Sequence, residues 1–257
     1  MLLVKGQERK EGSTVQVENK DRKYTYEDLL HIIRTLRSED GCPWDRVQTH
    51  ESLKPCMMEE AAELLASIRI YSQTGDPENM REELGDVLLQ VVMHAQIASE
   101  EGLFTMADVV DEVSRKMIRR HPHVFGKGSA DTPDEVLTNW EEIKKEEKKG
   151  KKWIASPLRE IPRELPALTR ATKVLKKIDK NYEKGSSYEQ NVAALQEAVD
   201  ALKICDHEAY SRELEKIMSD MLIRMSDIAR IAKISQEQAL TDRIEDLIDR
   251  YEGKEMP

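Results

Sequence analysis

The sequence of 257 residues has few aromatic residues and no long apolar run. Phe, Trp and Tyr together make up 5% of it. Stretches that alternate Val, Ile, Thr or Tyr with polar residues are rare, so a large β-sheet is not expected. No apolar run reaches the roughly 18 residues that a membrane-spanning helix needs. The apolar stretch within residues 1–23 is too short to predict a secretory signal.

Cysteine is scarce as well. The three cysteines, Cys42, Cys56 and Cys205, are odd in number and lie far apart in the sequence. A chain of this length buries enough surface to fold without disulfides. The sequence therefore favours a protein of the reducing cytoplasm.

Charge, in contrast, is abundant. The chain has 40 basic and 50 acidic residues, a net charge of −10, and only 39% apolar residues. This composition is typical of a helical, highly solvated protein of one or two domains. A negative protein gains nothing from a phosphate backbone unless it has a basic patch or recruits a cation, so we expect neither a nucleic-acid partner nor a membrane partner.

Apolar residues recur at helical spacing through most of the chain, and the breaks between these stretches delimit the expected helices. In the first half the helices begin after Thr25, run from about His50 to about Tyr71, follow the turn Ser72–Pro77 as far as Gly102, lie between Thr105 and Pro122, and open at Thr132-Pro133. In the second half they span about 167–182, 189–205, 208–233 and 236–252. No convincing strand pattern is present, so the predicted fold class is all-α.

One glycine and three prolines fall between residues 150 and 166, which marks a boundary. We therefore predict two helical-bundle units in tandem. The expected division is a loose tail at 1–23, a first unit at 24–149, a linker at 150–166 and a second unit at 167–257.

The second and third helices carry an acidic constellation. Residues 59–63 read E-E-x-x-E and residues 83–86 read E-x-x-D. At 100° per residue, each carboxylate pair lies on the same flank of the apolar stripe of its helix. A short turn makes the helices antiparallel neighbours, so we expect the stripes to face each other and the carboxylates to converge. The converging residues are Glu60, Glu63, Glu83 and Asp86.

Four converged carboxylates require protons or a cation. Two unit charges about 5 Å apart repel by roughly 3 kcal/mol at an effective dielectric constant of about 20. An all-oxygen cluster suits Mg²⁺, with Mn²⁺ as a substitute, and the lack of Cys or His disfavours zinc. The alternative is a solvated acidic face, which the repeated phase in two helices disfavours. Glu59 lies off the flank, as a base near a metal-bound water or as a solvated residue. Gln90 and His94 share the flank, in packing or supporting roles.

At these residues the sequence resembles the MazG family of nucleoside triphosphate pyrophosphohydrolases. The segments that carry the resemblance are GCPWDRVQTHESLKP, ELGDVLLQVVMHAQIASEEG, RRHPHVFG and NWEEIKKEE, within Tyr24–Lys149. IPRELPALTRATKV also resembles the start of the second repeat in long family members. The resemblance implies an all-α, Mg²⁺-dependent and usually dimeric enzyme that converts an NTP or dNTP to the monophosphate and pyrophosphate. It also implies that Glu60, Glu63, Glu83 and Asp86 are the metal ligands.

The same resemblance assigns the nucleotide to basic and aromatic residues after the acidic motifs. Lys116 and Arg120 are four residues apart and share a helical face that suits phosphate oxygens. Trp140 and Lys144 have the same spacing, which suits base stacking and phosphate binding. The alternative for each pair is a surface charge or a core aromatic.

Other candidates lie in the breaks between helices. Trp44 and Asp45 follow the first helix, as part of a substrate-pocket loop or of a structural turn. His121 and His123 flank Pro122, where we expect them to cap and pack rather than to bind metal.

The expected mechanism is metal-assisted hydrolysis. Glu59 or a ligand carboxylate positions the water that attacks the α-phosphorus, and Lys116 and Arg120 stabilise the developing charge. Three functions remain open: a broad-specificity house-cleaning enzyme, a specialised dUTP or dCTP hydrolase, and a nucleotide-sensing module without turnover.

The second half departs from the motif. When Asp220 is aligned with Asp86, Ile217 takes the place of Glu83, and Asp246 and Arg250 take the places of the basic pair. The counterpart of E-E-x-x-E is QEAVD at residues 196–200. We therefore predict a degenerate MazG-like repeat that serves dimerisation or regulation, with an altered second catalytic site as the alternative.

Overall fold

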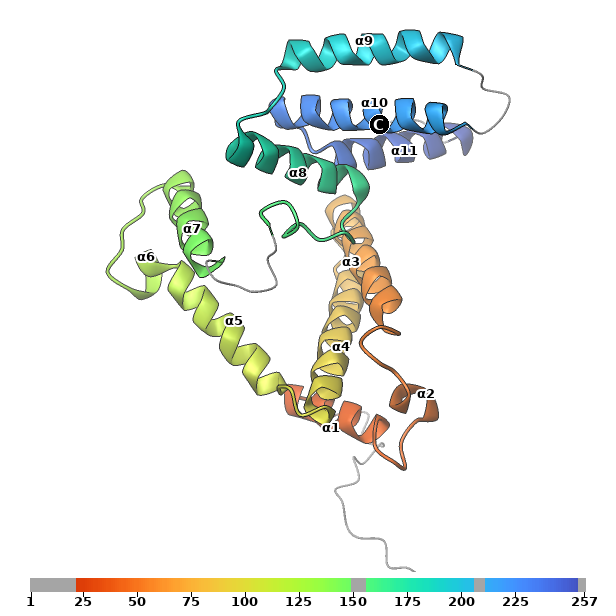
Figure 1. Ribbon diagram of the computed structural model, residues 1–257. Coiled ribbons are helices and arrows are strands. Elements are labelled where there is room, and N and C mark those ends of the chain that lie inside the picture. Colours follow the sequence, from red (N-terminus) through yellow and green to blue (C-terminus); the bar gives the residue numbers. More distant parts are fainter. Residues whose placement is uncertain (1–21, 149–155, 206–210, 254–257) are drawn as a thin grey trace, which may run out of the picture. The chain divides into compact units, whose positions relative to one another are not determined.

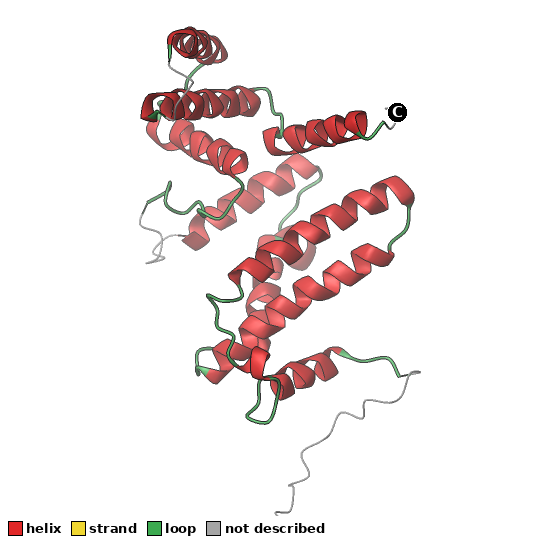
Figure 2. Cartoon of the chain, turned by 90° about the vertical axis from the view of Figure 1, so that its right-hand side faces the viewer, coloured by secondary structure: helices red, strands yellow, loops and turns green. Residues whose placement is uncertain are grey.

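The computed structural model describes residues 22–148, 156–205 and 211–253. Within these ranges the regular structure is α-helical and contains no strand (Figures 1 and 2). This confirms the predicted all-α class. No helix of the described ranges is long and apolar enough to cross a membrane. The tail predicted for residues 1–23 lies almost wholly outside the described residues, as does the first part of the expected linker.

The chain divides into two compact units, Met1–Ile143 and Lys144–Pro257. The division falls inside a helix, slightly before the proline-rich segment at 150–166. The helices of the first unit are α1 (Tyr26–Leu36), α2 (Pro43–Arg46), α3 (Lys54–Thr74), α4 (Glu78–Glu100), α5 (Met106–Arg120), α6 (Pro122–Phe125) and α7 (Pro133–Lys148), which extends across the division.

Two of these helices begin at capping boxes. The Thr25 hydroxyl accepts a hydrogen bond from the Asp28 amide, and the Asp28 carboxylate accepts one from the Thr25 amide. Thr105 and Asp108 repeat the arrangement at the start of α5. Each motif satisfies backbone donors that a helix start leaves without partners. Both helices therefore begin where the sequence places them.

The helices α2 and α6 were not predicted. Each has four residues and starts with a proline. Proline suits the first helical position, but one turn is too short to show a helical period. Sequence pattern alone therefore describes both segments as breaks.

The helices α3 and α4 form an antiparallel hairpin, which Figure 1 shows side by side. Gly75 ends α3 with φ of 74°, a left-handed conformation that suits glycine. The core of the unit lies where α1 and the start of α3 pack on the second half of α4. Its fully buried members are Ile33, Leu53, Val92, Met93 and Ile97.

The expectation that the apolar stripes of α3 and α4 face each other is wrong. Leu65 is 70% exposed and Leu84 is 52% exposed, although both lie on these stripes. Ser67 and Gln90, about 120° from the stripe centres at 100° per residue, are 1% and 6% exposed. The two helices therefore meet along the flank that carries the carboxylates, which leaves Leu65 and Leu84 uncovered within one chain.

A buried arginine fixes the segment around α2. Arg37 is 9% exposed, and its Nη2 lies 2.7 Å from Oε2 of Glu100 at the end of α4. Its Nη1 donates to the backbone carbonyls of Asp45, at 2.6 Å, and Gln48, at 3.2 Å. One guanidinium thus joins three chain segments.

The second unit contains α8 (Ala167–Tyr182), α9 (Tyr188–Ile204), α10 (Arg212–Ile231) and α11 (Gln236–Tyr251), close to the predicted ranges. Its interior includes polar groups: Asn191 and Ser226 are 0% exposed and Asp227 is 3% exposed. Asn191 Nδ2 donates to Asp227 Oδ2 at 2.7 Å, and Arg230 Nε donates to Oδ1 at 2.6 Å. The buried carboxylate is therefore both hydrogen-bonded and paired.

Candidate functional site

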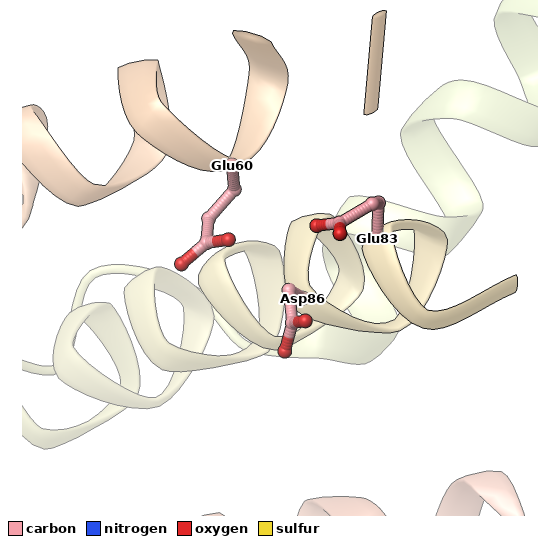
Figure 3. Close-up of side chains that lie close together, drawn as sticks. All are labelled: Glu60, Glu83 and Asp86. Carbon is pink, nitrogen blue, oxygen red and sulfur yellow. The ribbon is translucent and has the colours of Figure 1, made fainter. Parts of the chain in front are cut away.

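The hairpin brings three predicted metal ligands together. One carboxylate oxygen each from Glu60, Glu83 and Asp86 lies within 4.8 Å of the others (Figure 3). Glu83 and Asp86 are one turn apart on α4, and Glu60 reaches them from α3 across the flank where the helices meet. None of the three is fully exposed.

The negative charges of the three clustered carboxylates are not neutralised by a cationic side chain among the described residues. Desolvation raises the pKa of Glu60, and the charges of Asp86, Glu59 and Glu83 raise it further. Among the described residues no ion pair involves the three clustered carboxylates, and Glu83 accepts a neutral hydrogen bond from Asn79 Nδ2 at 2.8 Å. The site therefore has a free-energy incentive to take up a cation.

Glu63 and Glu59 lie at the margin of the cluster. Desolvation and the charge of Glu83 raise the pKa of Glu63, so it is within electrostatic reach, but it does not belong to the three-oxygen group. Glu59 is exposed, and its charge acts on both Glu60 and Glu63. The structure thus gathers three of the four predicted ligands and leaves Glu63 nearby.

The donor set fits a hard divalent cation. Mg²⁺ binds oxygen at about 2.1 Å, so opposite ligands lie about 4.2 Å apart. Three carboxylate oxygens within 4.8 Å need only a small closing movement to meet that spacing. Neither Cys nor His is in the group, which disfavours zinc.

A second group of predicted site residues lies at the end of α5. The Arg120 guanidinium sits 5.0 Å from the centroid of the Trp140 ring, and the His121 ring contacts Trp140 edge-on at 5.1 Å. A hydrogen-bonding contact of 2.6 Å joins His121 Nδ1 to the Met117 carbonyl. The histidine therefore packs and bonds locally, which agrees with its expected structural role.

Within one chain, the carboxylate cluster on α3 and α4 lies apart from the group around Arg120 and Trp140. In Figure 1, α5 leaves the end of α4 and runs away from the hairpin. Lys116 lines a cavity of about 450 Å³ with Phe104, Val109 and Val113, and Lys144 lies one turn after Trp140 on α7. Trp44 is 59% exposed, and the backbone of Asp45 is held by Arg37.

Comparison with known proteins places this arrangement in a family. Residues 48–125 match the family described as the MazG nucleotide pyrophosphohydrolase domain. The nucleoside triphosphate pyrophosphohydrolase/pyrophosphatase MazG of Thermotoga maritima is 39% identical over 230 residues, which cover 90% of this chain and 85% of that protein. The chain belongs to the MazG family.

Two further relatives extend this finding. The nucleoside triphosphate pyrophosphohydrolase of Escherichia coli K12 is 40% identical over 227 residues, 82% of this chain and 80% of the relative. The protein YabN of Bacillus subtilis is 42% identical over 211 residues, which cover 42% of its length. The MazG domain match contains α3, α4 and α5, and hence the acidic motifs with Lys116 and Arg120, whereas Trp140 and Lys144 lie beyond it.

Two residues near the MazG motifs make contacts that the sequence pattern did not predict. Arg37 has no distinctive signal, because an arginine at the end of an amphipathic helix is normally solvated. Gln90 shared the ligand flank in the sequence, and in the structure it is buried there, where its side chain offsets in part the raised pKa of Glu60.

The second unit lacks an equivalent MazG carboxylate group among its described residues. Asp200 pairs with Lys203 at 2.7 Å, Asp220 with Lys216 at 3.4 Å and Asp246 with Arg243 at 3.0 Å. Ile217 occupies the position that matches Glu83. Local cations therefore pair with three of the acidic groups that remain there.

Proposed function

We propose that this chain hydrolyses nucleoside triphosphates between the α- and β-phosphates, yielding a monophosphate and pyrophosphate. The observation that carries the proposal is the convergence of Glu60, Glu83 and Asp86, with no ion-pair partner in the part of the chain that the structure describes. The Thermotoga and Escherichia relatives are both named for this reaction. A triphosphate and a divalent cation together complement such a site in charge.

In this proposal Glu60, Glu83 and Asp86 hold Mg²⁺, and Glu63 joins them from the next turn of α3. When bound, the ion neutralises phosphate charge and lowers the pKa of a coordinated water. Glu59 stands beside the cluster and orients the attacking water at the α-phosphorus.

Cationic side chains bind the rest of the nucleotide. Lys116 and Arg120 contact phosphate oxygens, while Trp140 and Lys144 bind the base and the phosphate tail. The Arg120–Trp140 stack keeps a guanidinium and an indole together, which supports a shared role. Trp44 and Asp45 border the pocket on a segment held by Arg37.

We propose that the enzyme acts as a homodimer. Leu65, Leu84 and Val113 expose apolar surface on α3, α4 and α5, and large uncovered apolar patches mark interaction sites. A second copy covers these stripes and brings its own basic residues to the hairpin. Sedimentation velocity of the full chain should give a dimer, which Leu65→Glu should convert to a monomer.

Substrate range separates the proposed broad house-cleaning enzyme from its alternatives. Pyrophosphate release should be measured for all common NTPs and dNTPs with Mg²⁺ and with EDTA. We expect turnover of several substrates with Mg²⁺ only. Turnover of dUTP or dCTP alone would identify a specialised hydrolase, and no release from any substrate would favour a nucleotide sensor.

For the second unit we propose a non-catalytic role in dimerisation or regulation. Asp200, Asp220 and Asp246 are each paired with lysine or arginine, which supports this reading over a second catalytic site.

A further inference from the structure

Gln90 is a buried amide beside the carboxylate cluster. It lies one turn after Asp86 on the flank where α3 and α4 meet, and it is 6% exposed. Its side chain is near enough to Glu60 to offset in part the raised pKa of that carboxyl. Its carbonyl Oε1 is buried and has no hydrogen-bond partner among the described residues.

This orphan oxygen calls for an explanation, because buried polar atoms are normally paired and an unpaired one costs free energy. The side chain is enclosed where α3 and α4 meet, so its carbonyl cannot turn freely to solvent. A hydrated Mg²⁺ ion accepts neutral amide oxygens as well as carboxylates. A neutral donor adds an oxygen to the site without adding to the repulsion among the carboxylates.

The second unit provides an internal comparison. When Asp220 is aligned with Asp86, the position of Gln90 is Arg224. Arg224 Nη1 donates to Ser186 Oγ and Asn191 Oδ1, each at 3.3 Å. The hairpin that lost the glutamate at Ile217 thus carries a cation at this position, where a divalent ion would be repelled.

We propose that Gln90 is a positioning residue of the cation site: its amide N–H orients Glu60 and its carbonyl oxygen is a neutral donor to the hydrated ion. The inference rests on the proposed function, because it assumes that Glu60, Glu83 and Asp86 bind the cation.

The test measures Mn²⁺ binding to the full chain without nucleotide, by electron paramagnetic resonance. Gln90→Leu keeps the approximate volume and removes both polar atoms, and we expect its Kd for Mn²⁺ to rise about tenfold, as for other partners of metal ligands. The matched control is Gln96→Leu on the same helix, where Gln96 donates to Glu100 at 2.9 Å, and its Kd should not change. Melting temperatures in EDTA report separately on folding.

The outcomes distinguish the two proposals. If the wild type binds Mn²⁺, Glu83→Gln abolishes binding and Gln90→Leu stays within twofold of wild type, Gln90 has no role at the site and the cation site stands. If the wild type does not bind Mn²⁺, both proposals fail. Should Gln90→Leu not fold, Gln90→Asn retains an amide one methylene shorter and should also weaken binding. An unchanged Kd for that folded variant would overturn the inference.

Discussion

The α3–α4 and α9–α10 hairpins have the same helical pattern but differ in where their carboxylates lie and in whether cationic side chains pair with them. In the first, Glu60, Glu83 and Asp86 converge without a cationic side chain among the described residues. In the second, Asp200 and Asp220 each pair with a lysine on their own helix. The comparison teaches that the convergence of unneutralised carboxylates, rather than the number of acidic residues, distinguishes a candidate ion site from a solvated surface.

The hairpins also differ inside. Val92 and Met93 belong to the apolar core of the first unit, whereas the aligned positions in the second are Ser226 and Asp227, both buried. The first unit thus has an apolar interior, and its carboxylate cluster has no cationic partner among the described residues. The second unit has a polar interior whose buried carboxylate is paired with arginine, and its described residues contain no comparable carboxylate cluster.

The largest expected effect comes from removing one carboxylate from each hairpin. Asp86→Asn should lower kcat/KM by about 1,000-fold, since a metal-supported step loses roughly 4 kcal/mol of transition-state stabilisation. Asp220→Asn in the second unit should leave kcat/KM within twofold. Steady-state pyrophosphate release at saturating Mg²⁺ makes the measurement. Equal losses from both variants would show that both hairpins are catalytic.

The next effect concerns stability. Arg230→Ala leaves Asp227 buried without its ionic partner, which should lower the free energy of unfolding of the second unit by about 3 kcal/mol. Arg243→Ala breaks the exposed pair with Asp246 and should cost about 0.5 kcal/mol or less. Denaturant titration of both variants checks the difference. Similar small losses would mean that the buried network contributes little.

A smaller effect is acid sensitivity of the first unit. Burial, followed by the charge of His50, lowers the pKa of His94, whose Nδ1 lies 2.8 Å from that of His50. As the pH falls, the unfolded chain therefore binds a proton at His94 before the folded protein does. The free energy of unfolding should thus be highest above about pH 6.5 and should decline as the pH falls towards the folded-state pKa. His94→Ile copies the aligned Ile228 and should reduce this decline in melting temperature. An unchanged pH profile would exclude His94 as its source.

The smallest expected effect measures how much the repulsion among the clustered carboxylates destabilises the folded, metal-free protein. Desolvation and neighbouring carboxylates raise the pKa of Glu60, so the folded state disfavours its ionised form above about pH 4.5. Glu60→Gln should therefore raise the metal-free melting temperature at neutral pH while it weakens Mn²⁺ binding. The gain should vanish near pH 4.5, where the native carboxyl is protonated. A lower melting temperature in EDTA at neutral pH would mean that Glu60 stabilises the fold instead.

Local sequence signals predicted most of the helices and the gathering of the carboxylates. Capping residues such as Thr25 and Thr105 encode helix starts directly, and a spacing of three residues places the two acids of each motif on one face. The same angles did not reveal which face α4 presents to α3. A stripe such as that of Leu84 can be covered by the same chain or by another copy, and the hydrophobic period does not distinguish the two. The contacts of Arg37 and Gln90 depend on segments brought together by folding, which no local pattern contains.

The Arg37 clamp has a consequence for redesign. Its guanidinium holds Asp45 and Gln48 by their main-chain carbonyls, groups that every amino acid supplies. These two contacts thereby do not depend on the identity of the side chains at positions 45 and 48. Where Trp44 and Asp45 border the nucleotide pocket, as proposed, they can be exchanged in a library with the Arg37 contacts kept, so this loop is a favourable place to test for a changed nucleotide preference.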